Sequence, residues 1–179
     1  MSEICTERLR LRPWTREDRA LYAAMNADPT VMRYETGRLT RAESDARADE
    51  IDHIRSELGG LGMYASDLRL TGETIGFTVV LAVTDDLPCW PATQIGWRLV
   101  PSMWGNGYAT EAARALARRA FEDLGIAEII AFSVASNRRS VAVMHRLGMV
   151  RLSAEDFVHP EFAATDPRRH HVLYRLSAP

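Results

Sequence analysis

The sequence predicts one domain of mixed α/β fold, in which a single, mostly antiparallel sheet carries helices on both faces. Strand-like and helix-like segments follow one another in the order β-α-α-β-β-β-α-β-α-β-β, which gives seven strands and four helices. At 179 residues, of which 46% are hydrophobic, the chain is long enough for one buried core and short for two. No repeat or linker interrupts the chain, so we expect residues 1–179 to form a single domain.

The first third of the chain predicts one strand and two helices. Alternating leucines in "TERLRLRPW" indicate a strand over 7–12. Helices are expected over about 15–25 and about 40–58, and Gly59-Gly60 is expected to end the second one. Each helix begins with a threonine three residues before an acidic residue, which is the capping-box pattern (Thr15 and Asp18; Thr40 and Glu43).

Three strands and a change of period follow. The strands are expected over 62–70, 73–83 and 93–100, with a hairpin turn at Thr71-Gly72 between the first two. From Gly107 to Gly125 the apolar residues recur with a period of 3.6, which predicts an amphipathic helix.

The C-terminal part predicts three more strands and one more helix. The run "IAEIIAFSV" at 126–134 is apolar almost throughout, as is typical of a strand buried on both faces. Asn137 caps a helix that ends at Leu147-Gly148. The last strands are expected over about 149–153 and 170–176.

Composition excludes several classes of partner. The 22 basic and 24 acidic residues give a net charge of −2, so we expect no general attraction to nucleic acid or to an anionic membrane. The N-terminus does not resemble a signal peptide, and no apolar run is long enough to cross a bilayer. Cys5 and Cys89 have no metal-ligand spacing, and His170 and His171 have no companion ligand. These features predict a soluble, cytoplasmic protein without a metal.

The stretch "SMWGNGYATEAARAL" places two glycines directly before a helix and contains no lysine. The missing lysine excludes a P-loop. A dinucleotide-binding turn would need a third glycine where Thr110 stands and an acid at the end of the next strand, which Glu128 instead begins. Two interpretations remain: main-chain N–H groups from Gly105 to Thr110 hold a diphosphate at the helix N-terminus, or the glycines only turn the chain.

This stretch and a second one, "SVASNRRSVAVMHRLGM", together resemble the cofactor-binding core of the general N-acetyltransferase (GNAT) superfamily, and in particular its Rim-type branch, which includes ribosomal-protein N-acetyltransferases. The resemblance implies a sheet that splays open near its fourth and fifth strands, with coenzyme A in the opening and its pantetheine arm paired with the backbone near Leu99. It also implies that the diphosphate lies on the main-chain N–H groups of the following turn: Trp104, Gly105, Asn106, Gly107, Tyr108, Ala109 and Thr110.

The chain departs from the superfamily pattern at three places. Trp104 stands where Gln or Arg is usual, and we expect its side chain not to donate what an arginine would. Met144 stands where many members have a tyrosine acid, and a thioether cannot donate a proton. Gln94 stands where a glutamate base is common, so it can orient substrate or water but cannot take up the proton.

Several residues of the second motif have both a catalytic and a purely structural interpretation. Ser140 is the remaining proton donor for the thiolate, or a first-turn serine that satisfies the backbone. Asn137 contacts the pantetheine arm, caps its helix, or does both. Arg139, with its neighbour Arg138, lies near the nucleotide 3′-phosphate or is a solvated charge. Replacement bases are His159, Asp156 and Glu35, and the mouth of the substrate site is expected to include Tyr34, Trp90 and Phe157.

We therefore expect an acyl-CoA-dependent N-acyltransferase of bacterial type, which moves acetyl from acetyl-CoA to a primary amine by direct attack. Peptide N-termini, polyamines, aminoglycosides and amino acids are all candidate acceptors, and a monomer or a homodimer is expected. The alternative is a non-catalytic acyl-CoA-binding sensor, which the substitutions at Gln94 and Met144 keep open.

Overall fold

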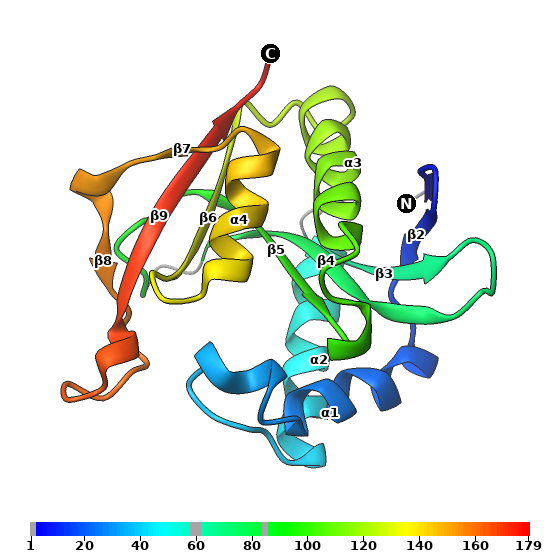
Figure 1. Cartoon of the computed structure of the whole chain (residues 1–179), viewed down its shortest axis with the longest axis horizontal. Helices are drawn as coiled ribbons and strands as arrows, with labels where there is room; N and C mark the ends of the chain where they lie inside the picture. Colours follow the sequence, from blue (N-terminus) through cyan, green and yellow to red (C-terminus); the bar gives the residue numbers. More distant parts are fainter. Residues whose placement is uncertain (1–2, 58–61, 84–85) are drawn as a thin grey trace.

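The computed structural model describes residues 3–57, 62–83 and 86–179, and within them a single sheet with four α-helices (Figure 1). The four helices are α1 (Arg19–Ala27), α2 (Arg41–Glu57), α3 (Tyr108–Glu122) and α4 (Arg138–Leu147). Nine strands form the sheet: β1 (Ile4–Cys5), β2 (Leu9–Pro13), β3 (Gly62–Leu68), β4 (Thr74–Ala82), β5 (Thr93–Leu99), β6 (Glu128–Val134), β7 (Val150–Arg151), β8 (Phe157–Val158) and β9 (His170–Ser177).

The order of the strands is β1-β2-β3-β4-β5-β6-β9-β7, with β8 paired to β9. All pairs are antiparallel except β5 and β6, which are parallel and share one register pair, Gln94 with Ile130. Beyond that pair the two strands diverge, so the sheet is open between them (Figure 1). The mostly antiparallel, splayed α/β sheet that the sequence predicts is therefore confirmed.

The seven expected strands are all present, and β1 and β8 are additional. These two strands contain two residues each, which is too short for an alternating pattern to show in the sequence. The expected end of α2 at Gly59-Gly60 lies outside the described residues. No helix in the described ranges combines the length and the apolar character needed to span a bilayer.

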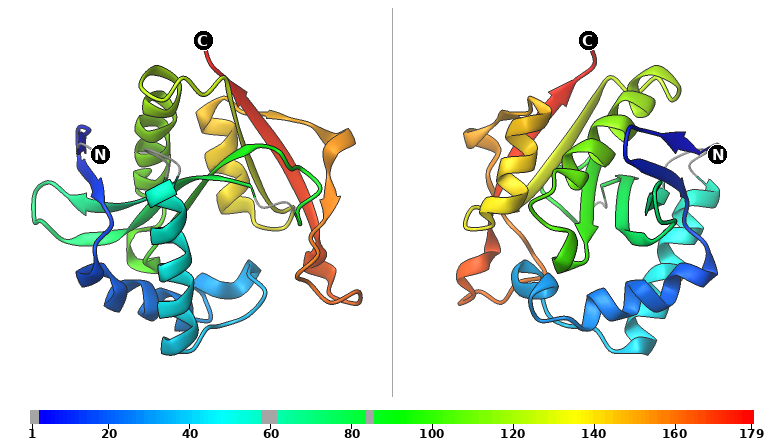
Figure 2. Two further views of the ribbon diagram at one scale, coloured as in Figure 1. Left: turned by 180° about the vertical axis from the view of Figure 1, so that it is seen from behind. Right: turned by 45° about the vertical axis from the view of Figure 1, so that its right-hand side comes forward.

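Helices cover both faces of the sheet, and Figure 2 shows α2 and α3 on opposite sides of it. The alternation of β3 explains this arrangement: Tyr64 faces the core under α3, whereas Met63 and Ala65 face α1 and α2. A smaller apolar cluster includes Ile130 of β6 and Leu173 of β9 and packs against this part of the sheet.

Gly76 of β4 lies opposite Leu99 of β5 with φ of 146°, which is a backbone conformation that favours glycine. A Cβ at this position would clash with the carbonyl oxygen of Arg98 and would lie 2.7 Å from the Cα of Leu99. The close approach of β4 and β5 at the open end of the sheet therefore depends on the missing side chain.

A buried ion-pair network joins β2, β3 and the start of α1. The guanidinium of Arg12 donates two hydrogen bonds of 2.7 Å to the carboxylate of Asp18, and its Nε donates to Asp67 at 2.9 Å. Asp67 also accepts a bond of 2.8 Å from the hydroxyl of Thr74. Both carboxylates are almost fully buried, so each requires these donors.

Candidate active site

The turn before α3 presents bare main-chain N–H groups. Gly105 and Gly107 adopt φ of 81° and 84°, and Gly107 is the N-cap of α3 without a side-chain cap. The N–H groups from Gly105 to Thr110 have no hydrogen-bond acceptor among the described residues, and the buried Oγ1 of Thr110 has none either. A helix end without caps favours an anion, so this turn fits a diphosphate.

The indole of Trp104 closes one side of this turn. Its Nε1 donates a hydrogen bond of 2.7 Å to the carbonyl oxygen of Leu99, and the guanidinium of Arg139 lies 4.9 Å from its ring centre. The indole donor is thus used by the end of β5, which is consistent with the expectation that this side chain does not replace the donors of an arginine. The tryptophan thereby joins β5 to the N-terminus of α4.

The turn is further fixed by Asn106, whose side-chain amide donates to the carbonyl oxygens of Met103 (3.2 Å) and Trp104 (3.3 Å). Tyr108 and Ala109 form the first turn of α3 and pack partly against the main core. Trp104 to Ala109 thus form one exposed or half-buried segment at the opening of the sheet, whereas Leu99 and Thr110 are buried.

The N-terminus of α4 borders the same opening. Asn137 accepts a bond of 3.4 Å from the N–H of Ser140, and its side-chain amide donates to the hydroxyl of Ser133 at 3.1 Å. Asn137 is therefore the helix cap that the sequence indicated. Ser140 lies half-buried in the first turn of the helix, whereas Met144 is buried in the core.

Gln94 is half-buried and occupies the register pair at which β5 and β6 part. Four residues further along β5, Arg98 donates a bond of 2.6 Å to the side chain of Asn26 and forms an ion pair of 3.2 Å with Glu35. The segment after the 3-10 helix η2 (Val31–Tyr34) is thereby held against the open end of β5.

A small cavity of about 110 Å³ lies beside the diverging part of β6. It brings together residues from the segment after η2, from β6 and from the chain around β9: Tyr34, Glu35, Thr36, Phe132, Ser133, His159, Glu161, Phe162 and His171. Four aromatic rings of this lining pack together, with centre-to-centre distances of 4.9 to 6.2 Å between contacting rings: Phe132, His159, Phe162 and His171.

A protein-family model described as an acetyltransferase (GNAT) domain matches residues 8–150 of the chain, which include the glycine turn and both borders of the open sheet. This chain belongs to the GNAT family. The match confirms the superfamily resemblance drawn from the two motifs, and it identifies residues 8–150 as an acetyltransferase domain.

Similar proteins support the assignment. The FsC-acetyl coenzyme A-N(2)-transacetylase of Aspergillus fumigatus is 33% identical over 153 residues, which are 82% of this chain and 64% of that protein. The chain therefore spans less than two thirds of that relative. The crystal structure of an acetyltransferase from Agrobacterium tumefaciens is 29% identical, with a TM-score of 0.80 over 99% of this chain and 95% of the other.

RimL, a ribosomal-protein acetyltransferase solved in complex with coenzyme A, has a TM-score of 0.78 over 98% of each chain. At 17% sequence identity, this likeness shows a shared fold.

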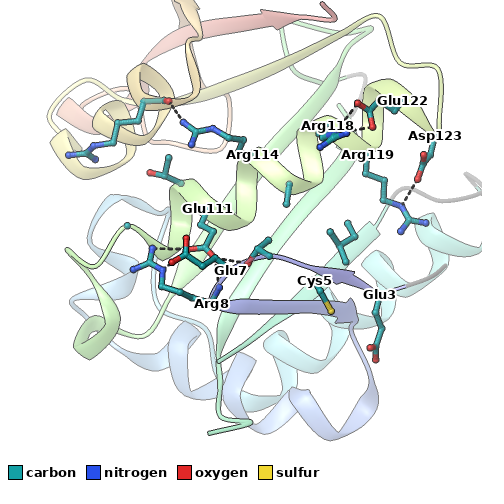
Figure 3. Close-up of a pocket in the computed structure, with 16 residues that line it drawn as sticks. Glu3, Cys5, Glu7, Arg8, Glu111, Arg114, Arg118, Arg119, Glu122 and Asp123 are labelled. Carbon is teal, nitrogen blue, oxygen red and sulfur yellow. Dashed lines mark hydrogen bonds and ion pairs between the residues drawn. The ribbon is translucent and has the colours of Figure 1, made fainter. Parts of the chain in front are cut away.

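An arginine from the bend between β1 and β2 holds the glycine turn of this GNAT protein from outside. Arg8 donates a bond of 3.0 Å to the carbonyl oxygen of Asn106 and lies 4.6 Å from the ring centre of Tyr108. It also forms an ion pair of 2.7 Å with Glu111 (Figure 3). The hollow drawn there, about 1000 Å³, is lined by the N-terminal segment, α3 and the end of α4. Arg8, which lines this hollow, therefore supports the turn from outside the opening between β5 and β6.

We expect Glu111→Gln to lower the free energy of unfolding by about 1–3 kcal/mol at neutral pH, because the carboxylate accepts hydrogen bonds from Thr6 and from the backbone and side chain of Arg8. Burial raises the pKa of Glu111, but these bonds outweigh it and the net pKa is lowered. The stabilisation is thus present above the carboxyl's unfolded pKa and is lost as pH falls through the lowered one.

Denaturant titrations at about pH 7 and about pH 3 measure this difference. The variant and the natural protein should converge at the lower pH. An equal difference at both would show that the charge of Glu111 is not what holds the turn.

The three replacement bases suggested by the sequence are separated by the structure. Glu35 and His159 line the small cavity, whereas Asp156 accepts bonds from Arg151 (2.5 Å) and from the N–H of Leu173 (3.1 Å). Of the expected mouth residues, Tyr34 lines the cavity, Phe157 is buried and stacks on His171 (5.7 Å between ring centres), and Trp90 is largely exposed.

His171 lines the small cavity, although the sequence did not single it out as a site residue. It is buried on β9, and its Nδ1 lies 3.2 Å from the carbonyl oxygen of Arg169. Burial lowers the pKa of His171 and that of His159, so both rings favour the neutral form. The available signal was the period of two along a strand, since it puts His171 on the same face as Leu173. No group of metal-binding side chains occurs in the described ranges.

Proposed function

We propose that this GNAT enzyme transfers acetyl from acetyl-CoA to a primary amine by direct attack, with residues 1–179 acting as one catalytic domain. The observation that carries the proposal is the uncapped turn from Gly105 to Thr110, which presents free N–H groups beside the opening between β5 and β6. These groups suit the diphosphate of coenzyme A, and the backbone of β5 up to Leu99 suits its amide-bearing arm.

In this proposal acetyl-CoA supplies the activated thioester. Gly105, Asn106, Gly107, Tyr108, Ala109 and Thr110 bind the diphosphate through their N–H groups. Trp104 shapes the turn and holds Arg139 for the nucleotide phosphate. Asn137 keeps the first turn of α4 at the opening, where the hydroxyl of Ser140 protonates the departing thiolate. Gln94 orients the acceptor or a water molecule at the point where the strands part.

The paired motifs, which resemble the Rim-type branch, support a place in that branch and a peptide N-terminus as acceptor. A small-molecule amine is the other candidate acceptor, because the relative from Aspergillus fumigatus is named as an FsC N(2)-transacetylase and not as a ribosomal-protein acetyltransferase. We further propose a cytoplasmic protein that works as a monomer or homodimer.

We expect Gly105→Ala to weaken coenzyme A binding about tenfold or more, because its methyl group would project into open space at the turn that the diphosphate approaches. Gly125→Ala is the matched control. Gly125 also has a positive φ, of 64°, and open space around its Cβ, but it follows the other end of α3. Titration calorimetry with coenzyme A measures both variants. Equal affinities would argue against the turn as the binding site.

Release of free thiol from acetyl-CoA, measured with a panel of peptides and small amines, tests the transfer itself. Release that depends on an amine supports the enzyme. Tight binding of acetyl-CoA with no release on any amine would favour the sensor instead.

A further inference from the structure

The small cavity beside β6 adjoins the proposed thioester site. Phe132 and Ser133, which line it, follow Ile130 on the part of β6 that has separated from β5. Ser133 also accepts a hydrogen bond from Asn137, the cap of the helix that carries Ser140. The hydroxyl of Tyr34 donates to the carbonyl oxygen of Ser136 at 3.2 Å, in the loop before this cap. The cavity and the N-terminus of α4 are thus joined through β6 and its following loop.

Of the two ring nitrogens of His171, one forms a hydrogen bond to the backbone and the other has no hydrogen-bond partner among the described residues. A carbonyl oxygen can only accept, so the contact between Nδ1 and the carbonyl of Arg169 requires a proton on Nδ1. In the neutral ring the lone pair then lies on Nε2. Nε2 has no hydrogen-bond partner in the part of the chain that the structure describes, and His171 lines the cavity.

The charges around this ring favour a cation in the cavity. Glu35 lines the cavity from the segment after η2. Glu161 and His159, whose pKa is lowered by burial so that it favours the neutral form, line it from the loop before β9. Arg98 and Arg168 hold the Glu35 segment, the first by its ion pair and the second by a bond of 2.8 Å to the carbonyl oxygen of Glu35. The remaining walls are faces and edges of aromatic rings, which also attract an ammonium group.

We propose that His171 is the general base of the reaction, whose Nε2 takes the proton from a primary ammonium group bound in this cavity. The inference rests on the proposed function. The ammonium loses one proton to Nε2, and the freed nitrogen lone pair forms the C–N bond as the thioester C–S bond breaks. The second proton of the nitrogen leaves with the thiol, and His171 passes the first to solvent, which gives amide, thiol and one proton.

The same charges set the class of acceptor. Two acidic residues, Glu35 and Glu161, line the cavity, and its volume of about 110 Å³ admits the end of a molecule. It therefore suits an unhindered ammonium group with no carboxylate nearby. β-Alaninamide and β-alanine share one skeleton, and we expect the amide to have a kcat/KM at least about tenfold higher. Equal values, or a preference for β-alanine, would overturn this acceptor class.

The test of the base is His171→Asn, which keeps a donor for the carbonyl of Arg169 and removes the basic nitrogen. We expect kcat/KM at about pH 7 to fall about 100-fold or more. The natural enzyme should show a plateau between about pH 7 and pH 9, since neutral His171 deprotonates the bound ammonium. The variant depends on amine already neutral in solution, so its kcat/KM should rise about tenfold per pH unit towards the amine pKa near 10.

His170→Asn is the matched control, because His170 is the exposed neighbour on the same strand, and its rate and pH profile should not change. If His171→Asn kept a plateau at a lower level, the residue would be structural and the inference would fail. An unchanged rate would overturn it as well.

Nitrogen NMR of the histidine rings tests the same point without turnover. We expect His171 at about pH 7 to be neutral with its proton on Nδ1. A proton on Nε2, or a charged ring, would overturn the inference even in a protein that binds coenzyme A normally. Loss of coenzyme A binding would instead count against the proposed function.

Discussion

Replacing Gly76 with alanine is expected to lower the free energy of unfolding by about 3–5 kcal/mol, because two costs coincide. The backbone at φ of 146° is strained for any residue with a Cβ, and the new methyl group would clash with the carbonyl oxygen of Arg98. The atoms in the way belong to the backbone of β5, so the only relief is to move β5 away from β4. Chemical denaturation measures the loss.

Gly96→Ala is the control for this prediction. Gly96 lies on β5, next to the same seam between β4 and β5, and its added Cβ would meet a methyl group of Val79 at 3.2 Å. A side chain can shift by a few tenths of an ångström, so we expect a cost of about 1 kcal/mol or less. If the two variants were equally stable, the close contact at Gly76 would not be a real constraint.

Arg12→Ala is expected to lower the free energy of unfolding by a similar amount, about 3–5 kcal/mol at neutral pH. The substitution leaves Asp18 and Asp67, which are 6% and 1% exposed, without their shared guanidinium. Burial raises the pKa of Asp18, but in the natural protein the bonds from Arg12 outweigh burial and the net pKa is lowered. This stabilisation is present above the unfolded carboxyl pKa and is lost as pH falls through the lowered one. The deficit of the variant should therefore shrink in acid, as measured by unfolding at several pH values.

Arg10→Ala separates the buried pair from a surface one. Arg10 also contacts Asp67, at 2.8 Å, but its side chain is 45% exposed and its charge is screened by water, so we expect a much smaller loss than for Arg12→Ala. Equal losses in the two variants would contradict the argument that burial makes Arg12 important.

Local signals in the sequence predicted local features of the structure correctly. The capping boxes at Thr15 and Thr40, the Asn137 cap and the helix that follows the glycine turn are all present. Each of these features depends on residues that are only a few positions apart, so it can be predicted from a short stretch of the sequence.

The features that the sequence analysis missed depend on contacts between distant segments. Arg8 supports a turn about 100 residues away, and His171 meets Glu35 and His159 only after β9 has paired with β6 and β8. Trp104 was judged by what it could offer a ligand, although its donor is used by a carbonyl at the end of β5. No spacing rule along the chain reports such pairs, because the sheet brings them together.

The single register pair between β5 and β6 has a consequence for how the whole molecule resists unfolding. The strands from β1 to β5 and those from β6 onward are coupled through the backbone at one place, and α3, packed on β4, β5 and α4, bridges them. A ligand with amide groups that lies along the gap would form hydrogen bonds with the strand edge, as an additional strand would, and would link the two halves of the sheet. The melting temperature of the protein would then rise with the concentration of the ligand, because binding stabilises the folded state.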